Sequence, residues 1–298
     1  MKATTHTETY RPFKGELRTS PFRFLTIGWS GIRHGFKRKL PLLLLFAPTT
    51  ISGIIACVFV HLKFTAEAGS LGDEARGIAM IAALSGQLSE VASMITEYIV
   101  NVRFFALLAI AWYGSGLIAE DRRVGAHLLY FSRPITRLDY LLGKLTAAAF
   151  YGAWAILSPA LLICLTACFS SPEWSFLTDK WDVILETILY CSLWITTLAL
   201  IVLAMSSLVE RKTWALIGVF AVILLTQAGA EVLIELTDER QWQLLSLFQV
   251  FERIADGMFD QQTDLEIGYG AALKAAGAWC GLSLLVLGLR LRRMEVVA

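Results

Sequence analysis

The stretch Asp121-Arg122-Arg123-Val124-Gly125, continued by Ser132-Arg133-Pro134-Ile135-Thr136-Arg137, decides the fold because of what flanks it. It is a short basic segment, broken by proline, between two long apolar runs. An apolar run of about 20 residues crosses the hydrocarbon core of a bilayer as a helix. The segment must therefore lie in water at a membrane face, where it connects two membrane spans.

The composition extends this interpretation to the whole chain. Apolar residues make up 56% of the 298 residues and only 17% are charged, which is too few to cover a water-soluble body of this size. The sequence predicts an all-α membrane protein with six transmembrane helices. The expected spans are Leu40–Leu62, Tyr98–Leu117, Leu145–Phe169, Val183–Leu208, Trp214–Ala230 and Ala271–Leu289.

Lys and Arg are unevenly divided between the two sides of these spans. Of the 26 in the chain, nine precede the first span, five lie in Ala119–Lys144, two are Arg211 and Lys212, and three follow the last span. By the positive-inside rule this shared side is the cytoplasm, so we expect a multi-pass protein of the cell (inner) membrane with both termini cytoplasmic. The basic residues then serve topology and contacts with membrane lipids, and the net charge of +1 indicates no nucleic-acid partner.

Motifs for catalysis are missing from the sequence. It contains no G-x-x-x-x-G-K-[ST] phosphate loop, no G-x-S-x-G elbow and no H-E-x-x-H pair. The five cysteines all fall inside expected spans, where a buried Cys acts as a small apolar residue. Cys164 and Cys168 would suit a soft metal only if further ligands converged on them. We therefore expect no metal, no cofactor and no enzymatic activity in this chain itself.

An amphipathic helix is expected just before the first span. Ser20-Pro21 supplies a helix start, and large apolar residues follow at spacings of three and four, with basic and small residues between them. Such a helix lies flat in the cytoplasmic interface of a membrane; the alternative is a soluble helix packed on a partner. The apolar residues are Phe22, Leu25, Trp29, Ile32 and Phe36.

Two segments on the outer side are too long for simple turns. Lys63–Glu97 contains Leu84, Leu88, Val91 and Ile95 at helical spacing, so we expect the second span to continue as a helix above the membrane. Glu231–Gly270 contains the amphipathic stretch Gln241–Phe259, expected on the outer leaflet or as a re-entrant element.

Charged residues near the outer ends of spans are a second set of candidates. Charge at membrane depth is costly and often functional, which indicates an intramembrane or outer-gate site; the alternative is that these side chains snorkel to the interface. The four residues are Arg103, Glu186, Glu231 and Lys274. Arg103 and Glu186 lie at similar expected depth, and we predict that they form an ion pair.

The cytoplasmic segment has a local pattern of its own. Glu120 and Asp121 are expected at a helix start, where acidic groups suit the helix dipole, and Gly125 permits a bend. Pro134 ends the helix, since the residue before a proline avoids the α region, and Thr136 is expected to cap the next one.

This pattern resembles the permease subunits of ABC-2 type transporters. In that family a cytoplasmic coupling helix joins the second and third spans and is followed by an S-R-P-[IV]-[ST]-R…Y…G-K-like sequence. The matching residues are Gly125, Leu128, Ser132, Arg133, Pro134, Ile135, Thr136, Arg137, Tyr140, Gly143 and Lys144. The order of a flat amphipathic helix, six spans and a long loop before the last span is also similar. Without the resemblance, topology alone would explain Arg133 and Arg137.

The resemblance implies the arrangement of the whole assembly. Two permeases, either two copies of this chain or this chain with a paralogue, would lie above two cytoplasmic ABC ATPase subunits that bind ATP and Mg²⁺. Residues 1–39 would form a cytoplasmic tail and an interfacial elbow helix, and 40–298 the transmembrane domain. Coupling to the ATPases would rest on Asp121, Arg122, Arg123, Gly125, Leu128, Ser132, Arg133, Pro134, Thr136 and Arg137.

Two functions follow from this architecture. The first is an exporter permease, in a family whose substrates include lipids, peptides, drugs and glycans. The alternative is a mechanical or assembly component that transmits ATP-driven motion to an extracytoplasmic partner without moving a solute. An integral membrane enzyme is disfavoured by the missing catalytic clusters.

Overall fold

The computed structural model describes residues 22–37, 39–69, 90–126, 135–263 and 265–294. Within these ranges the chain is helical and has no strands, and six helices are long and apolar enough to cross a membrane. Their ranges are Pro41–Glu67, Val91–Arg123, Arg137–Ser170, Trp181–Leu208, Lys212–Thr237 and Tyr269–Arg292. The prediction of an all-α protein with six spans is confirmed, and each helix is longer than its apolar run because polar residues extend the helix beyond it.

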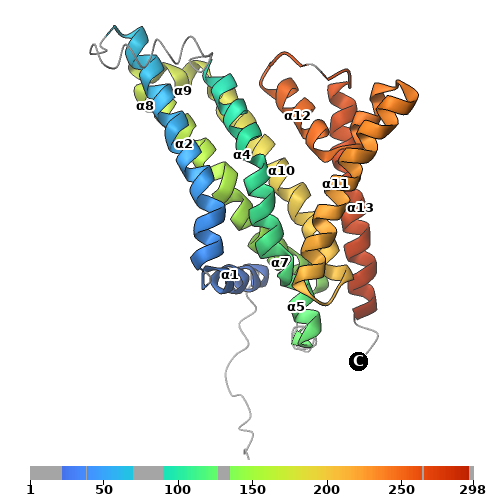
Figure 1. Cartoon of the computed structure of the whole chain (residues 1–298). Helices are drawn as coiled ribbons and strands as arrows, with labels where there is room; N and C mark the ends of the chain where they lie inside the picture. Colours follow the sequence, from blue (N-terminus) through green and yellow to red (C-terminus); the bar gives the residue numbers. More distant parts are fainter. Residues whose placement is uncertain (1–21, 38, 70–89, 127–134, 264, 295–298) are drawn as a thin grey trace, which may run out of the picture.

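The spans form one bundle, and one helix lies across an end of this bundle, roughly perpendicular to the spans (Figure 1). The crossing helix is α1 (Arg23–Phe36), and the described chain also ends near it. The short helix α12 (Leu247–Met258) lies at the opposite end of the bundle. These two ends are called the α1 end and the α12 end below. The long helices are α2 (Lys39–Glu67), α4 (Val91–Gly114), α10 (Trp181–Leu208), α11 (Lys212–Thr237) and α13 (Tyr269–Met294).

The third span is built from three pieces. These are α7 (Arg137–Gly152), a π turn (Ala153–Leu157) and α8 (Ser158–Ser170). Pro159 has no N–H to donate and its ring crowds the carbonyl four residues earlier, so the helix widens locally at this point. At the α12 end, α8 is followed by a 3₁₀ turn (Pro172–Trp174) and α9 (Ser175–Asp179).

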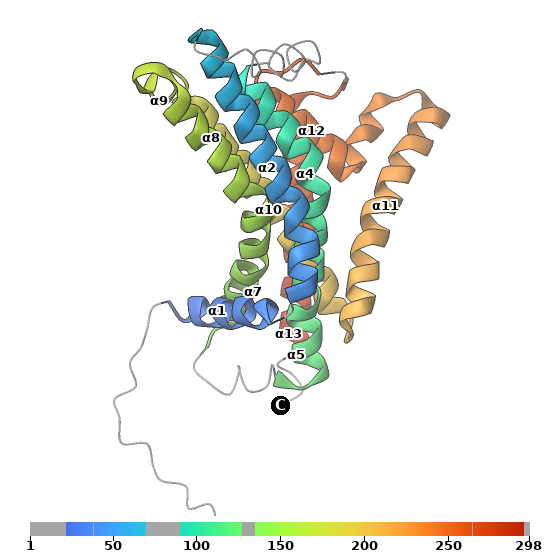
Figure 2. The ribbon, with the colours of Figure 1, turned by 60° about the vertical axis from the view of Figure 1, so that its left-hand side comes forward.

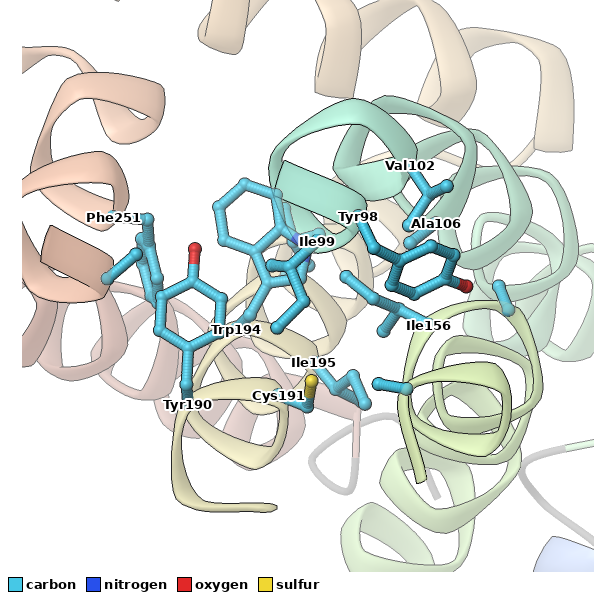
Figure 3. Packing of buried hydrophobic residues seen from close by; sticks show 14 of the residues in the cluster. Tyr98, Ile99, Val102, Ala106, Ile156, Tyr190, Cys191, Trp194, Ile195 and Phe251 are labelled. Atoms are coloured by element: carbon cyan, nitrogen blue, oxygen red, sulfur yellow. The ribbon is translucent and has the colours of Figure 1, made fainter. Parts of the chain in front are cut away.

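The core lies between α4 and α10, the two helices with the largest buried share. Figure 3 shows their side chains interdigitating with the π turn of the third span and with α12. Trp194 and Tyr190 of α10 are fully buried, and Trp194 meets Phe251 of α12 edge-on at 4.6 Å between ring centroids. By contrast, only 17% of the apolar window of α11 is buried, so α11 lies at the periphery (Figure 2).

Helix α1 packs tightly across α7. Gly28, Gly31 and Gly35 form its inner face, and a Cβ on Gly31 would lie 3.0 Å from the Cβ of Ala147. The Tyr151 hydroxyl donates to the Ile32 carbonyl at 2.7 Å and fixes the end of α1. The glycines are needed because only a bare backbone lets the two helices approach this closely.

The amphipathic stretch near residue 250 is not one continuous helix. It begins as a 3₁₀ turn (Arg240–Leu245) and restarts at Ser246, whose hydroxyl accepts from the Gln249 N–H and so caps α12. Sequence periodicity could not reveal this break, because both pieces place apolar residues at similar spacing. In the second span, Val91 and Ile95 belong to α4 as expected, whereas Leu84 and Leu88 lie outside the described residues.

Candidate functional site

The second span continues past its apolar run as a short helix at the α1 end. This helix, α5 (Gly116–Arg123), follows α4 after the single residue Ser115. The prediction that Glu120 and Asp121 open a helix is wrong: both lie in the last turn of α5. The apolar run of the second span ends at Leu117, but the backbone stays helical as far as Arg123. No new helix therefore begins at Glu120. Gly125 then turns the chain with φ of +68°, a left-handed conformation that glycine adopts without strain, as the expected bend requires.

A serine from another span is inserted where α4 meets α5. The buried Ser206 hydroxyl of α10 donates to the Ser115 carbonyl at 2.7 Å and accepts from the N–H groups of Ile118 and Ala119 at 3.2 and 3.0 Å. In a regular helix the Ala119 N–H would bond directly to the Ser115 carbonyl. A side chain that enters this ladder is a recognised cause of a bend. Ser206 therefore joins α10 to the junction of α4 and α5.

Asp121 joins α5 to the beginning of the third span. Its Oδ2 lies 2.7 Å from Lys144 Nζ and accepts a hydrogen bond of 2.9 Å from the Tyr140 hydroxyl, both on α7. The Lys144 side chain is 7% exposed and that of Asp121 17%. A charge this buried is tolerated only when it is paired and hydrogen-bonded. The pair thus connects α5 and α7, the two helices on either side of the segment 121–137.

Arg122 fixes α5 to the end of the fourth span. Its Nη1 donates to the carbonyl of Ser207 at 2.7 Å, and its Nη2 lies 3.9 Å from the exposed Glu210 carboxylate. A helix of eight residues is therefore held by one ion-paired side chain on α7 and by two contacts on α10. Displacement of α5 would be passed to both the third and the fourth span.

The far side of the segment is capped as expected. The Thr136 hydroxyl accepts from the Asp139 N–H at 3.1 Å, and the Asp139 carboxylate accepts from the Thr136 N–H at 3.1 Å, which forms a capping box at the start of α7. Arg137 follows as the first residue of α7 and is exposed. Leu128, Ser132, Arg133 and Pro134 lie outside the described residues.

The apolar stripe predicted for the flat helix is mostly on its outer face. Phe22, Leu25, Trp29 and Phe36 are exposed, with Trp29 at 65%. Ile32 is an exception, since it is 8% exposed and packs inward. One side of α1 packs against α7 and the other side is exposed, so its apolar residues are divided between two faces. Ser20 and Pro21 lie outside the described residues.

The predicted ion pair between Arg103 and Glu186 is wrong. Arg103 Nη2 lies 2.8 Å from Glu252 Oε2 of α12, and its Nη1 donates to the Phe248 carbonyl at 3.3 Å. Helix α12 packs against α4 and places the Glu252 carboxylate beside Arg103. This contact could not be predicted by comparing how deep residues lie within their spans. Glu186 is half-buried on α10 and lies near Asp182 and Asp260.

Glu231 and Lys274 are separate from this outer contact. Glu231 is exposed on α11 and accepts from the Gln227 side-chain amide at 2.8 Å, while Lys274 is exposed on α13. The four charged residues therefore do not form one site. Among the described residues, no group of three or more His, Cys, Asp or Glu side chains could hold a metal ion.

Several residues of the site have only weak signals in the sequence. Tyr140 and Lys144 belong to the quoted motif, but their common partner Asp121 precedes them by about twenty residues. Ser206 has no motif at all; a serine inside an apolar span is usually a small packing residue. The one sequence signal is its position near the end of the fourth span, five residues before Arg211.

Comparison with known proteins agrees with this architecture. Residues 38–275 match the model of the family described as ABC-2 family transporter protein, and a search of curated proteins finds no match. The matched region contains five of the six spans in full and the beginning of the sixth, together with α5 and the residues that hold it. The chain therefore belongs to the ABC-2 family of transporter proteins, as a multi-pass membrane subunit.

Proposed function

We propose that this chain is the permease subunit of an ABC exporter, driven by two cytoplasmic ATPase subunits that bind the segment 121–137. Membrane subunits of the ABC-2 family typically pair with ABC ATPases. The distribution of Lys and Arg assigns the α1 end to the cytoplasm, which is the side on which ATP would be hydrolysed. ATP and Mg²⁺ would be bound by the partner subunits.

The observation that supports this function best is the connection of α5 to two other spans. Asp121 binds Lys144 and Tyr140 of α7, and the Ser206 hydroxyl of α10 hydrogen-bonds to backbone groups where α4 meets α5. A force applied to the segment therefore acts on a short rigid helix rather than on a loose loop. A tilt of α5 against α4 at this junction would carry α7 and α10 with it.

The transport step then follows from differential binding. ATPase subunits that bind one tilt of α5 more tightly shift the bundle toward the conformation that has this tilt, by no more than their difference in affinity. On the outer side, Arg103 and Glu252 hold α12 against α4, so a change in the span bundle would also move α12. This element is the proposed outer gate of the exporter.

Assembly with the ATPase tests the proposal. Gly125→Trp introduces a large side chain at φ of +68° beside the proposed docking surface, and Arg133→Glu reverses a charge of the motif. We expect both variants to co-purify with less ATPase or to lose regulated ATP hydrolysis in lipid nanodiscs. Gly69→Trp is the matched control, since Gly69 has φ of +70°, open space around it, and lies at the other end of α2.

Measurements on the same complex also distinguish an exporter from a mechanical component that moves no solute. Stimulation of ATP hydrolysis by a small amphiphile supports export, whereas a stable complex with an extracytoplasmic protein and no such stimulation supports the mechanical role. Wild-type assembly and wild-type regulated hydrolysis in both Gly125→Trp and Arg133→Glu would show that the segment is only a topological connection.

A further inference from the structure

A cavity of about 300 Å³ lies at the α1 end, between α1, α5, α7 and the beginning of α11. Its polar lining includes Ser30, His34, Glu120, Arg123, Lys144 and Lys212. Ile27, Leu117 and Tyr151 supply apolar wall. The cavity is therefore amphipathic, with charged groups and apolar groups on the same enclosed surface.

The charged side chains that line the cavity include more basic than acidic groups. The carboxylate of Asp121 is occupied by Lys144 and Tyr140, so this pair is neutral. Of the remaining side chains, Glu120 is acidic, and Arg123 and Lys212 are basic. Arg123 is exposed and makes no ion pair with any residue that the structure describes, while Lys212 Nζ lies 4.5 Å above the Trp112 ring. The cavity thus carries a net positive charge and favours an anionic group.

The position of α1 indicates where this anion comes from. Phe22, Leu25 and Trp29 are exposed on one side of α1, and a helix of this kind lies in the membrane interface with its apolar face against the acyl chains. Residues of α1 line the cavity, so it lies at the depth of lipid headgroups. Basic pockets at this depth on the cytoplasmic side bind phosphate-bearing headgroups.

We propose that the cavity binds the phosphate of a phospholipid from the leaflet in which α1 lies. Arg123 and Lys212 would neutralise the phosphate, with His34 and Ser30 as further hydrogen-bond partners, and the apolar wall would take the first part of the acyl chains. The bound lipid joins α1, α5 and α11, whereas the direct contacts of α1 are mainly with α7. This inference does not depend on the ATPase, because it concerns the permease and the membrane alone.

Lipid binding to the delipidated permease tests the inference. The protein in detergent is titrated with dioleoyl phosphatidylglycerol, and the bound lipid is counted by native mass spectrometry. We expect Arg123→Gln/Lys212→Gln to bind the lipid roughly 25-fold more weakly, at about fivefold for each charge removed. Arg211→Gln/Arg292→Gln removes two exposed charges from the same end but outside the cavity, and should bind like the wild type.

A second pair of variants tests occupancy of the cavity without a change in charge. Ser30→Trp fills the cavity and should weaken lipid binding, whereas Thr26→Trp, one turn earlier on an exposed site outside the cavity, should not. Helical circular dichroism and gel filtration show whether each variant is folded. If Ser30→Trp does not fold, the lipid affinity of Arg123→Gln/Lys212→Gln alone tests the inference.

Three outcomes would overturn the inference. Full lipid retention in Arg123→Gln/Lys212→Gln would show that the cavity does not bind the headgroup. Equal loss in Arg211→Gln/Arg292→Gln would show a general surface effect. Binding of sn-glycerol 3-phosphate as tight as that of the lipid would assign the site to a free phosphate compound instead.

Discussion

Lys144 Nζ lies 2.7 Å from Asp121 Oδ2, and the two residues lie on α7 and α5, the helices on either side of the segment 121–137. Asp121 is in the last turn of α5 and Lys144 is in the second turn of α7. The segment between them therefore leaves and re-enters the bundle at a fixed separation. This is the geometry that a soluble partner would need in order to bind the segment and move both helices together.

Loss of Lys144 should destabilise the bundle strongly. Lys144→Met removes the ammonium group that lies 2.7 Å from the buried Asp121 carboxylate, and breaking a buried pair costs about 3 kcal/mol in unfolding free energy. Asp121→Asn/Lys144→Met should recover part of this loss. The measurement is unfolding in mixed detergent and dodecyl sulfate. The control is Arg122 with Glu210, whose 3.9 Å contact is mostly exposed and should couple by no more than about 1 kcal/mol. Similar coupling in both pairs would contradict the buried role of Lys144.

Ser206→Ala should weaken the connection of α5 to α10. The change removes an acceptor from two buried N–H groups and a donor from the Ser115 carbonyl, so we expect a loss of about 1–3 kcal/mol. Ser207→Ala is the control, because that hydroxyl, equally buried, donates to the carbonyl of Ala204 in its own helix. Hydrogen exchange at the Ala119 amide measures the effect directly. Slower exchange in Ser206→Ala would mean that the ladder closes and that the serine is not needed there.

Arg103 should couple energetically to Glu252 and not to Glu186. The Arg103 side chain is 15% exposed and that of Glu252 41%, so we expect a coupling of roughly 1 kcal/mol, reduced by salt. A double-mutant cycle with Arg103→Met and Glu252→Gln measures it, and the same cycle with Glu186→Gln should give zero. Coupling of Arg103 to Glu186 and not to Glu252 would contradict the contact with α12 and support the ion pair predicted from the sequence.

The ion pair of Glu90 with Lys180 at the α12 end should give a small pH dependence. The Lys180 hydrogen bond and charge hold the pKa of Glu90 below its ordinary 4.5, and Glu90 raises the pKa of Lys180. The Glu90 contribution is present above pH 4.5 and is lost as the pH falls through the lowered pKa. The Lys180 contribution is lost only as the pH rises through its raised pKa. Both side chains are more than half exposed, so the gain stays below about 1 kcal/mol.

The comparison that isolates this pair is wild type against Glu90→Gln. At neutral pH the wild type should unfold at a slightly higher dodecyl sulfate fraction, and the difference should vanish in acid below the lowered pKa of Glu90. A difference that persists unchanged in acid would mean that the carboxylate charge is not its cause.

Local chemistry explains which features could be predicted from the sequence. The six spans follow from apolar runs, and the Gly125 bend and the Thr136 cap involve residues within a few positions of each other. Such features need only backbone geometry and a short-range hydrogen bond. They are therefore readable from one sequence, even inside a membrane protein.

The other features depend on how distant helices rotate and cross. Glu252 reaches Arg103 across 149 positions because α12 folds back onto α4, and no periodicity fixes that contact. Ile32 turns inward because α7 covers one side of α1. The predicted helix start at Glu120 fails for a related reason: the apolar run ends at Leu117, but the backbone stays helical to Arg123, where residues of α7 and α10 contact it.

The most direct test of the central claim, that the segment 121–137 receives the ATPase, is site-specific photo-crosslinking. A benzoylphenylalanine is placed at Val124, which is 67% exposed at the end of α5, or at Trp174, which is 50% exposed at the α12 end. The proposed function predicts an adduct of permease and ATPase mass from Val124 and none from Trp174. An adduct from Trp174, or none from Val124 in a complex that contains the ATPase, would contradict it.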